Sequence, residues 1–340
     1  MTPQDRLRYS RQMLVSCFGE EGQRRVLASS AAVAGCGGLG TYIADALGRA
    51  GVGRLVLIDR DYVEFSNLQR QSLYQESDAA EGLPKAVAAA CRLRAVNSSI
   101  RIQPEVADLT SANIARILEG VDVVLDGTDN FETRYLINDF CVSKGIPWVY
   151  GGAVSTQGTV MPVLPGRTAC LKCIYPVAPP NGGVTCETVG ILNTVPALIA
   201  AIQASEALKI LAGKQDAVSR RLTSVDVWSG VIRQVKQPPP DPECVTCGLR
   251  EFVHLAARPR GPVTLCGRNA VQIHEQARAL DLEALAARLR ALGEVRANPF
   301  ALRLSISPYE MTVFPDGRAI VKGTTDTGLA RSLYARYIGS

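Results

Sequence analysis

Residues Ala31–Gly40 read AAVAGCGGLG, a short apolar run that leads directly into the pattern G-x-G-x-x-G. The pattern is carried by Gly35, Gly37, Gly38 and Gly40. Glycines let the backbone turn sharply and approach phosphate oxygens, and the start of a following helix adds partial positive charge. Asp59 closes the next apolar run, where an acidic side chain can accept hydrogen bonds from ribose hydroxyls. The stretch predicts a nucleotide-binding strand–loop–helix unit, with a glycine turn made only for packing as the alternative.

The first half of the chain alternates apolar runs typical of strands with segments long enough for helices. The expected strands are Ala31–Ala34, Arg54–Asp59, Ile100–Val106, Val121–Asp126 and Ile146–Tyr150, and the expected helices are Tyr42–Ala50, Lys85–Val96 and Phe131–Lys144. From Gly151 onward, strands surround one apolar helix, Pro196–Leu211; they are Gly158–Leu164, Leu222–Trp228 and Val231–Lys236. We therefore expect an α/β fold with a Rossmann-like, mostly parallel sheet flanked by helices and an antiparallel β extension.

Two proline-rich segments divide the chain. Pro238–Pro242 breaks regular structure, and Arg258–Pro262 has the composition of a linker. We therefore expect one domain over residues 1–257 and a small α+β C-terminal domain over residues 262–340. The second domain is expected to contain two helices, Asp281–Ala291 and Thr327–Tyr337, and two strands joined by a turn at Pro315–Gly317.

Composition argues against several classes of protein. A net charge of +5 over 340 residues is small, and no cluster of Lys and Arg with interleaved aromatics predicts a nucleic-acid partner. The N-terminus has no apolar signal segment, and Val195–Leu211 is expected to be too short and too charged to span a bilayer. We expect a cytoplasmic protein with no membrane partner, whose ten cysteines are ligands, reactive thiols or fillers rather than disulfides.

Charged and amide side chains follow the glycine loop in an order that suits a polyphosphate better than a nicotinamide. They are Asn67, Arg70, Lys85, Asp129 and Asn130. Arg and Lys neutralise phosphate charge, and an Asp at the C-terminal end of a strand can hold the Mg²⁺ that bridges phosphate oxygens. Taken singly, Arg70 and Lys85 are more typical of solvated surface charges than of ligands, and Asp129 could be the N-cap of a helix; their joint order along the chain is what favours ligands.

Two C-x-x-C pairs supply four thiolates, the number that a closed tetrahedral zinc site takes. Their members are Cys170, Cys173, Cys244 and Cys247. The long separation of the pairs makes the spacing only moderately specific, and redox dithiols or unrelated thiols are the alternatives. A closed site implies a structural zinc that fastens the segment after Pro238–Pro242 to the sheet domain.

The remaining cysteines and histidines carry weaker signals. Cys186 lies in a glycine-rich run before the apolar helix, where a thiol can be reactive, although Glu187 beside it opposes thiolate formation. A chemical role and a bystander role are both open for it. Five other cysteines lie in or beside apolar elements and are expected to be fillers: Cys17, Cys36, Cys91, Cys141 and Cys266. Structural roles are expected for both histidines, His254 and His274.

Over residues 5–250 the ordered set of motifs resembles the ThiF/MoeB/HesA adenylyltransferases, the bacterial relatives of ubiquitin-activating enzymes. The motifs are Arg8–Gln12, the glycine loop, Asn67–Gln71, Lys85, Asp126–Asn130 and both cysteine pairs. The resemblance implies that Asp59 binds the ATP ribose, that Asn67, Arg70 and Lys85 contact phosphates, and that Asp129 coordinates Mg²⁺. It also implies that Arg11 reaches the nucleotide of a neighbouring subunit, and hence a homodimer. At the position of Cys186 some members carry a sulfur-bearing or thioester-forming cysteine.

In that family, ATP activates the C-terminal glycine of a small ubiquitin-like sulfur carrier as an acyl-adenylate, which later receives sulfur, for instance from a persulfide donor. Segments near Cys266, Pro315–Gly323 and the C-terminus resemble ThiF-type proteins of thiamine thiazole synthesis. A ThiS-like carrier is therefore expected, with a MoaD-like carrier of molybdenum cofactor synthesis as the alternative. Gly151-Gly152 is expected to leave room for the carrier's Gly-Gly tail, with a simple turn as the alternative. An NAD-dependent oxidoreductase and a non-catalytic carrier-docking scaffold are the alternatives of other classes.

Overall fold

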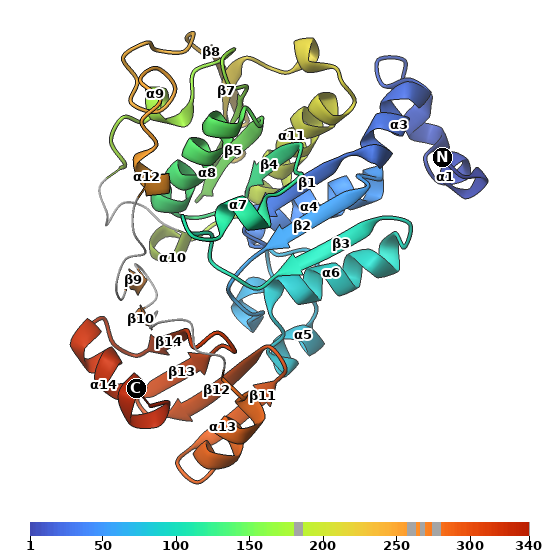
Figure 1. The fold of residues 1–340 in the computed structure, drawn as a ribbon. Coiled ribbons are helices and arrows are strands. Elements are labelled where there is room, and N and C mark those ends of the chain that lie inside the picture. The colour runs from blue at the N-terminus through green and yellow to red at the C-terminus, as the bar shows by residue number, and fades with distance from the viewer. Residues whose placement is uncertain (180–185, 257–262, 266–268, 274–279, 340) are drawn as a thin grey trace. The chain divides into compact units, whose positions relative to one another are not determined.

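The computed structural model describes residues 1–179, 186–256, 263–265, 269–273 and 280–339. The chain divides into two compact units. One unit comprises Met1–Pro179 and Val189–Arg258, and the other comprises Pro180–Thr188 and Pro259–Ser340. Figure 1 shows the course of the chain and the labels used below.

The first unit is built on an eight-stranded sheet in the order β3-β2-β1-β4-β5-β6-β7-β8. The strands are β1 (Ser30–Ala34), β2 (Arg54–Ile58), β3 (Arg101–Glu105), β4 (Val123–Asp126), β5 (Trp148–Val154), β6 (Gln157–Val163), β7 (Arg221–Asp226) and β8 (Val231–Lys236). From β3 to β5 all neighbours are parallel, and from β5 to β8 they are antiparallel. The predicted fold class, a mostly parallel α/β sheet with an antiparallel extension, is confirmed.

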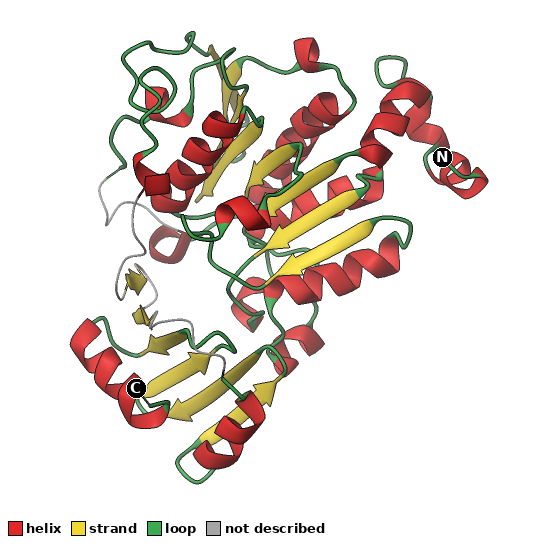
Figure 2. Cartoon of the chain, in the orientation of Figure 1, coloured by secondary structure: helices red, strands yellow, loops and turns green. Residues whose placement is uncertain are grey.

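Helices cover both faces of this sheet because alternate residues of each buried strand point to opposite sides. In β1, Ala31 and Val33 pack in one apolar cluster with α4 (Gly38–Ala50), α6 (Lys85–Val96) and α11 (Thr194–Leu211). Ala32 and Ala34 pack in the other cluster, with α7 (Ile114–Ile117) and α8 (Phe131–Lys144). Figure 2 shows the helices on both sides of the strands.

Helix α11 corrects one argument from the sequence. It is long and apolar enough to cross a membrane by length and composition, so the expectation that this stretch is too short and too charged was wrong. More than half of its membrane-length window is buried, and the helix packs against α4, β5 and β6. Core helices of soluble proteins pass the same length and composition test, so the signal is weak evidence for a membrane span.

The second unit has an antiparallel six-stranded sheet in the order β11-β12-β13-β14-β10-β9. Its strands are β9 (Val263–Leu265), β10 (Ala270–Ile273), β11 (Glu294–Asn298), β12 (Ala301–Ile306), β13 (Tyr309–Val313) and β14 (Ala319–Lys322). Two helices, α13 (Leu282–Leu289) and α14 (Thr327–Tyr337), share its apolar core. Asp281 and Asp326 cap them. The two predicted helices, and the two strands β13 and β14 with the turn between them, are present, while β9, β10, β11 and β12 were not expected.

Candidate functional site

The loops after β1 and β4 meet where the strand order reverses direction, which is where open α/β sheets bind ligands. Gly127 donates its N–H to the carbonyl of Ala34 at 2.7 Å. A Cβ on Gly35, where φ is +87°, would lie 2.6 Å from the carbonyl oxygen of Gly127. The two predicted ligand-binding segments, Gly35–Gly40 and Asp126–Asn130, are therefore in direct contact at one edge of the sheet.

Two glycines of the loop, Gly40 and Gly37, differ in what surrounds them. A Cβ on Gly40 would collide with the carbonyl of Gly35, so packing alone requires that glycine. Gly37 has space instead, because its nearest neighbour, the Gln71 Nε2, would lie 4.0 Å from a Cβ there. Helix α4 begins at Gly38 and no side chain caps its N-terminus. The helix start can therefore offer N–H groups to an anion over Gly37.

Asp59, just after β2, binds the loop backbone. Its Oδ2 accepts from the Cys36 N–H at 2.7 Å, and its Oδ1 accepts from the Asp61 N–H at 2.7 Å. Desolvation raises the pKa of Asp59 above its usual value, and the charge of Asp61 acts in the same direction while Lys85 opposes it. The carboxylate predicted to bind ribose thus also determines the path of the glycine loop.

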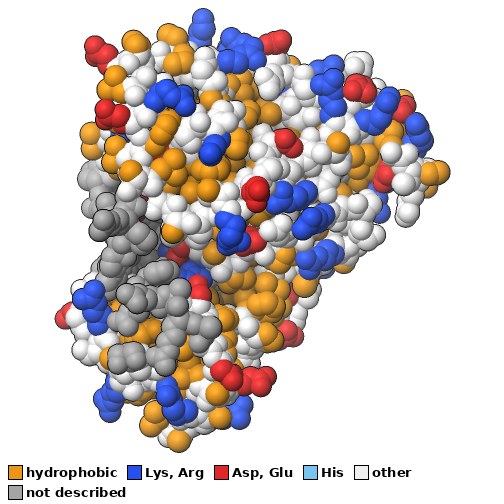
Figure 3. All heavy atoms as spheres, in the orientation of Figure 1, with side chains coloured by type: hydrophobic (Ala, Val, Ile, Leu, Met, Phe, Trp, Pro, Cys, Tyr) orange, Lys and Arg blue, Asp and Glu red, His pale blue; other side chains and the backbone are white. Residues whose placement is uncertain are grey.

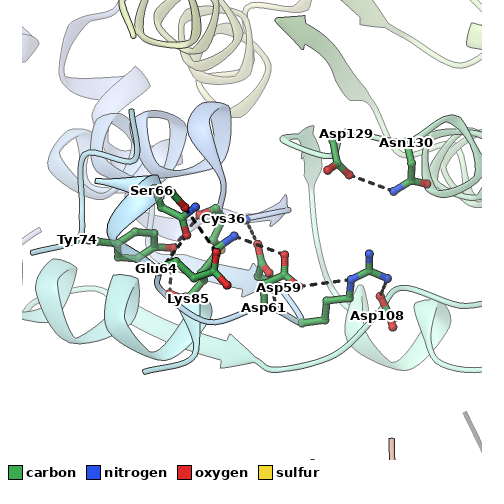
Figure 4. Close-up of polar contacts among 12 residues, drawn as sticks. Cys36, Asp59, Asp61, Glu64, Ser66, Tyr74, Lys85, Asp108, Asp129 and Asn130 are labelled. Carbon is green, nitrogen blue, oxygen red and sulfur yellow. Dashed lines mark hydrogen bonds and ion pairs between the residues drawn. The ribbon is translucent and has the colours of Figure 1, made fainter. Parts of the chain in front are cut away.

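Lys85, the first residue of α6, places a buried ammonium beside the carboxylates of Asp59 and Asp61. Its side chain is only 7% exposed, and its Nζ lies 3.4 Å from the Asp61 Oδ2. The Tyr74 hydroxyl donates to the carbonyl of Cys36 at 2.7 Å and lies 3.1 Å from the carbonyl of Lys85, which connects the loop to the start of α6. Figure 4 shows Cys36, Asp59, Asp61, Tyr74 and Lys85 gathered in one group.

Asn67 and Arg70 lie on the segment that covers the helix start. Asn67 ends the short 3-10 helix η1 (Phe65–Asn67), and its buried Oδ1 accepts from the N–H of Glu64. Arg70 is half-buried and donates to the carbonyl of Ser66 at 2.8 Å. The Arg70 Cγ would lie 3.8 Å from a Cβ on Gly38, so the arginine stem packs on the loop. The structure therefore brings Arg70, Lys85 and the glycine loop together.

Asp129 and Asn130 follow β4, in the loop whose Gly127 contacts Gly35. The Asn130 Oδ1 accepts from the N–H of Thr133 at 2.8 Å, so Asn130, and not Asp129, is the N-cap of α8. The capping alternative considered for Asp129 is therefore wrong. Asp129 is exposed, and Figure 4 shows it across from Asp59 and Lys85.

Beneath this loop lies an ion pair that the sequence argument missed. The Arg134 Nε lies 3.0 Å from the Asp126 Oδ2, and both side chains are buried. Arg134 also donates to the carbonyls of Thr128 at 2.7 Å and Gly151 at 3.0 Å. Burial by itself lowers the pKa of Arg134, but the charge of Asp126 outweighs it and leaves that pKa raised. An arginine one turn into the helix after DGTDN was the available signal, and it orients the loop that carries Asp129.

Gly151 has a packing reason that the sequence did not indicate. A Cβ on Gly151 would collide with the amide of Gln203 on α11. That amide donates to the carbonyls of Asp126 at 2.8 Å and Val149 at 3.1 Å. Gly151 is therefore needed for packing where α11 meets β4 and β5. The half-exposed Gly152 alone is left as a glycine that could make room for the carrier's Gly-Gly tail.

Arg11 lies far from the glycine loop of its own chain. It is exposed on α2 (Ser10–Met13), whose Gln12 donates to the carbonyl of Ala50 at the end of α4. Arg8 donates to the carbonyl of Val96 at the end of α6. Gly38 and Lys85 are at the opposite ends of these helices, and 13 residues of α helix are about 20 Å long.

The four paired cysteines converge on one point. The Sγ–Sγ distances are 3.8 Å for Cys170–Cys173, 3.7 Å for Cys170–Cys244 and 3.3 Å for Cys173–Cys247, and all four sulfurs lie within 4.8 Å of one another. Four sulfurs at about 2.3 Å from a tetrahedral zinc are about 3.8 Å apart, so the arrangement fits this ion. The hydrogen bond between Cys170 and Cys173 lowers the pKa of Cys173 and raises that of Cys170, so the two thiols share one readily formed thiolate.

Helix α8 supports this cluster with two polar side chains. Asn138 donates to the Cys170 Sγ at 3.6 Å and accepts from the N–H of Leu171 at 2.9 Å. The buried Asp139 accepts from the Thr246 hydroxyl and from the His254 N–H, both at 2.8 Å. Such outer contacts orient metal ligands. The same helix therefore joins the Asp129 loop at its start to the cysteine cluster in its middle.

The predictions for the other cysteines and the histidines are confirmed for some residues and wrong for others. Cys186 begins α10 (Cys186–Val189), and its side chain lies outside the described residues, as do Cys266 and His274. Cys36 and Cys141 are buried, and burial raises the pKa of both thiols, as expected for fillers. Two other cysteines, Cys17 and Cys91, are exposed, so the filler prediction was wrong for them. The ring of His254 stacks on Tyr135 at 5.1 Å between centroids.

Comparison with known proteins agrees with this geometry. The model of the ThiF family matches residues 9–246, and the chain belongs to that family. The sulfur carrier protein ThiS adenylyltransferase of Bacillus subtilis is 41% identical over 336 residues, which are 98% of this chain and 99% of the relative. The adenylyltransferase and sulfurtransferase MOCS3 of Sus scrofa is 40% identical over 248 residues, 73% of this chain and 54% of the relative.

Among solved structures, MccB of E. coli with ATP has a similar fold. Its TM-score is 0.62 at 23% identity, over 71% of this chain and 74% of the other. At this level of identity the likeness concerns the fold alone. Together the comparisons confirm the predicted family and the predicted enzyme class, an adenylyltransferase, in place of the oxidoreductase and scaffold alternatives.

Proposed function

We propose that this chain uses ATP to adenylylate the C-terminal glycine of a small ubiquitin-like sulfur carrier. The observation that carries the proposal is the convergence of an uncapped helix start, a half-buried arginine and a buried lysine at one sheet edge. These groups suit a triphosphate, whose charge they neutralise. The names of both relatives, a ThiS adenylyltransferase and MOCS3, agree with the general activity.

The reaction needs positioning and charge stabilisation more than proton transfer. The glycine carboxylate attacks the α-phosphorus of ATP, a P–O bond forms, and the bond to the β-phosphate oxygen breaks as pyrophosphate leaves. Arg70 and Lys85 would stabilise the negative charge that grows on the phosphates, and the buried Lys85 ammonium interacts with such charge more strongly than a cation in water. Asp129 is exposed after β4 and would hold Mg²⁺, which neutralises further phosphate charge when bound.

The ThiS-like carrier is the better-supported partner. The alignment with the ThiS adenylyltransferase of Bacillus subtilis extends over 98% of this chain and so includes the second unit. The alignment with MOCS3 covers 73% of the chain. Sulfur transfer from a persulfide donor, a part in it for Cys186, and a cytoplasmic location remain predictions. On the face shown in Figure 3, Lys and Arg side chains are interspersed with Asp and Glu, which suits a protein partner better than a nucleic acid.

ATP–pyrophosphate exchange with purified carriers tests the proposal. We expect exchange activity that depends on a ThiS-like protein ending in Gly-Gly. With a MoaD-like protein the activity should be lower by at least about tenfold, because a difference of only about 1.4 kcal/mol in binding free energy between the two carriers has this effect. A carrier without its last glycine is the control. Exchange with the MoaD-like protein alone would assign the other pathway, and exchange with neither would contradict the proposal.

We also propose a homodimer in which Arg11 enters the site of the neighbouring subunit. Its place at the far ends of α4 and α6 keeps it from the glycine loop of its own chain. The Arg11→Ala and Lys85→Ala variants are each expected to be inactive. When the two are mixed so that their subunits redistribute, about a quarter of the wild-type ATP–pyrophosphate exchange activity should return. Half of the dimers then contain one chain of each kind, and one of the two sites in such a dimer is complete. Each variant mixed with itself is the control, and no regain despite confirmed mixing would contradict the composite site.

A further inference from the structure

Two glutamines anchor the segment before β1 to the far end of α4. The Gln12 Nε2 donates to the carbonyl of Ala50 at 3.1 Å and to the Gln23 Oε1 at 2.7 Å. The buried Gln23 donates from its Nε2 to the same Ala50 carbonyl at 3.0 Å. The last carbonyls of a helix have no partner within the helix, and the two amides satisfy one of them. They thereby fix α2 and α3 (Gly19–Ala28) to the end of α4.

A second anchor joins this segment to the end of α6. Tyr9 is buried, and its hydroxyl accepts from the Asn97 Nδ2 at 2.9 Å. The same Nδ2 donates to the carbonyl of Gly48 at 2.8 Å, so Asn97 also connects the ends of α4 and α6. Arg8 donates to the carbonyl of Val96, the last residue of α6, at 3.0 Å. The segment is therefore held by the two helices whose first residues form the phosphate site.

Within the motif Arg8–Gln12, Arg11 differs from its neighbours. Ser10 donates to the carbonyl of Leu7, and the other three residues make the contacts given above. The guanidinium of Arg11 is exposed and has no hydrogen bond or ion pair to the described residues. Helix α2 has only four residues, so it has little stability of its own and depends on the anchors for its position.

We propose that Gln12, Gln23 and Arg8 are positioning residues, which hold α2 so that Arg11 meets the nucleotide in the neighbouring subunit. The inference rests on the homodimer of the proposed function. It assigns the three anchors to the site of the partner and not to the site of their own chain. A cation that stabilises developing charge is effective only at a fixed place, so loss of an anchor costs activity although Arg11 itself is intact.

The first measurement is carrier-dependent ATP–pyrophosphate exchange by Gln12→Leu, whose side chain has a similar size and donates no hydrogen bond. We expect about tenfold lower exchange at saturating ATP, which corresponds to about 1.4 kcal/mol of lost transition-state stabilisation. Gln4→Leu is the control, because this glutamine is exposed on α1 (Pro3–Arg8), and it should keep wild-type exchange. Arg8→Ala removes an exposed anchor without a change in the core, and it should show a smaller decrease.

Mixed dimers then show which site the lost anchor impairs. Gln12→Leu mixed with Lys85→Ala should rise to about a quarter of wild-type exchange, because the intact site in each mixed dimer receives a well-placed Arg11 from the Lys85→Ala chain. Gln12→Leu mixed with Arg11→Ala should stay at or below the activity of Gln12→Leu alone, because neither chain supplies a well-placed Arg11. The same two mixtures are made with Arg8→Ala, which carries the test if Gln12→Leu does not fold.

The reverse pattern would overturn the inference. If Arg11→Ala restores activity and Lys85→Ala does not, Gln12 acts through α4 on the glycine loop of its own chain. Restoration by both partners or by neither, or wild-type exchange in both anchor variants, would also overturn it. The Arg11→Ala and Lys85→Ala mixture is the reference. If that mixture regains nothing, the proposed composite site fails. If it regains activity while the anchor variants lack the expected pattern, only the positioning role fails.

Discussion

Replacing Lys85 with alanine is expected to lower carrier-dependent ATP–pyrophosphate exchange by about 10²–10³-fold, the usual effect of removing one preorganised group that stabilises transition-state charge. The effect should be large because the ammonium is buried, with 7% of its side chain exposed, and is held 3.4 Å from the Asp61 Oδ2. A desolvated cation interacts more strongly with phosphate than one in water. The measurement is exchange at saturating carrier over a range of ATP concentrations.

Lys214→Ala is the matched control, because that lysine is exposed between α11 and β7. It should keep full exchange activity. The Tm of Lys85→Ala must also be measured, since Asp61 loses a neighbour in this variant and a loss of folding would imitate a loss of catalysis. Folded Lys85→Ala with wild-type exchange would show that Lys85 has no phosphate role.

Replacing Cys170 with serine is expected to remove about one zinc ion per chain and to lower the Tm by about 10–20 °C, because loss of a structural metal removes several kcal/mol of stability. Cys170 is buried and its sulfur is within 3.8 Å of both Cys173 and Cys244. A serine hydroxyl is a poor zinc ligand, and the variant leaves three thiols with no closed site. Metal analysis and thermal unfolding of the purified protein measure the two effects.

Cys91→Ser provides the control for cysteine chemistry in general, since this thiol is exposed on α6. It should retain zinc and the wild-type Tm. A strong chelator added to the wild-type protein should reproduce the Tm of Cys170→Ser. Wild-type protein that holds no zinc after growth with zinc, and a Cys170→Ser variant as stable as wild type, would both argue for redox dithiols or unrelated thiols instead.

Much of the architecture was predictable because its signals are local. Apolar runs and helix-length segments predicted the order of β1 to β5 with α4, α6 and α8, and the two cysteine pairs predicted a four-thiol cluster. Strands β11 and β12 of the second unit were not predicted. They alternate polar residues such as Arg296 and Arg303 with apolar ones, as a strand with one buried face does, and a search for continuous apolar runs does not detect this pattern.

The sequence by itself determined the chemistry: a glycine loop after a strand, cations and carboxylates in a family-specific order, and four thiols. These depend on residue type and spacing, which the chain states directly. Tertiary structure alone decided the roles of Gly151 and Arg134. A close approach to Gln203 and a buried ion pair with Asp126, whose carboxylate lies at the end of β4, each depend on which segment packs against the residue. That packing is a property of the folded sheet and its helices, because residues far apart in the chain become neighbours only there.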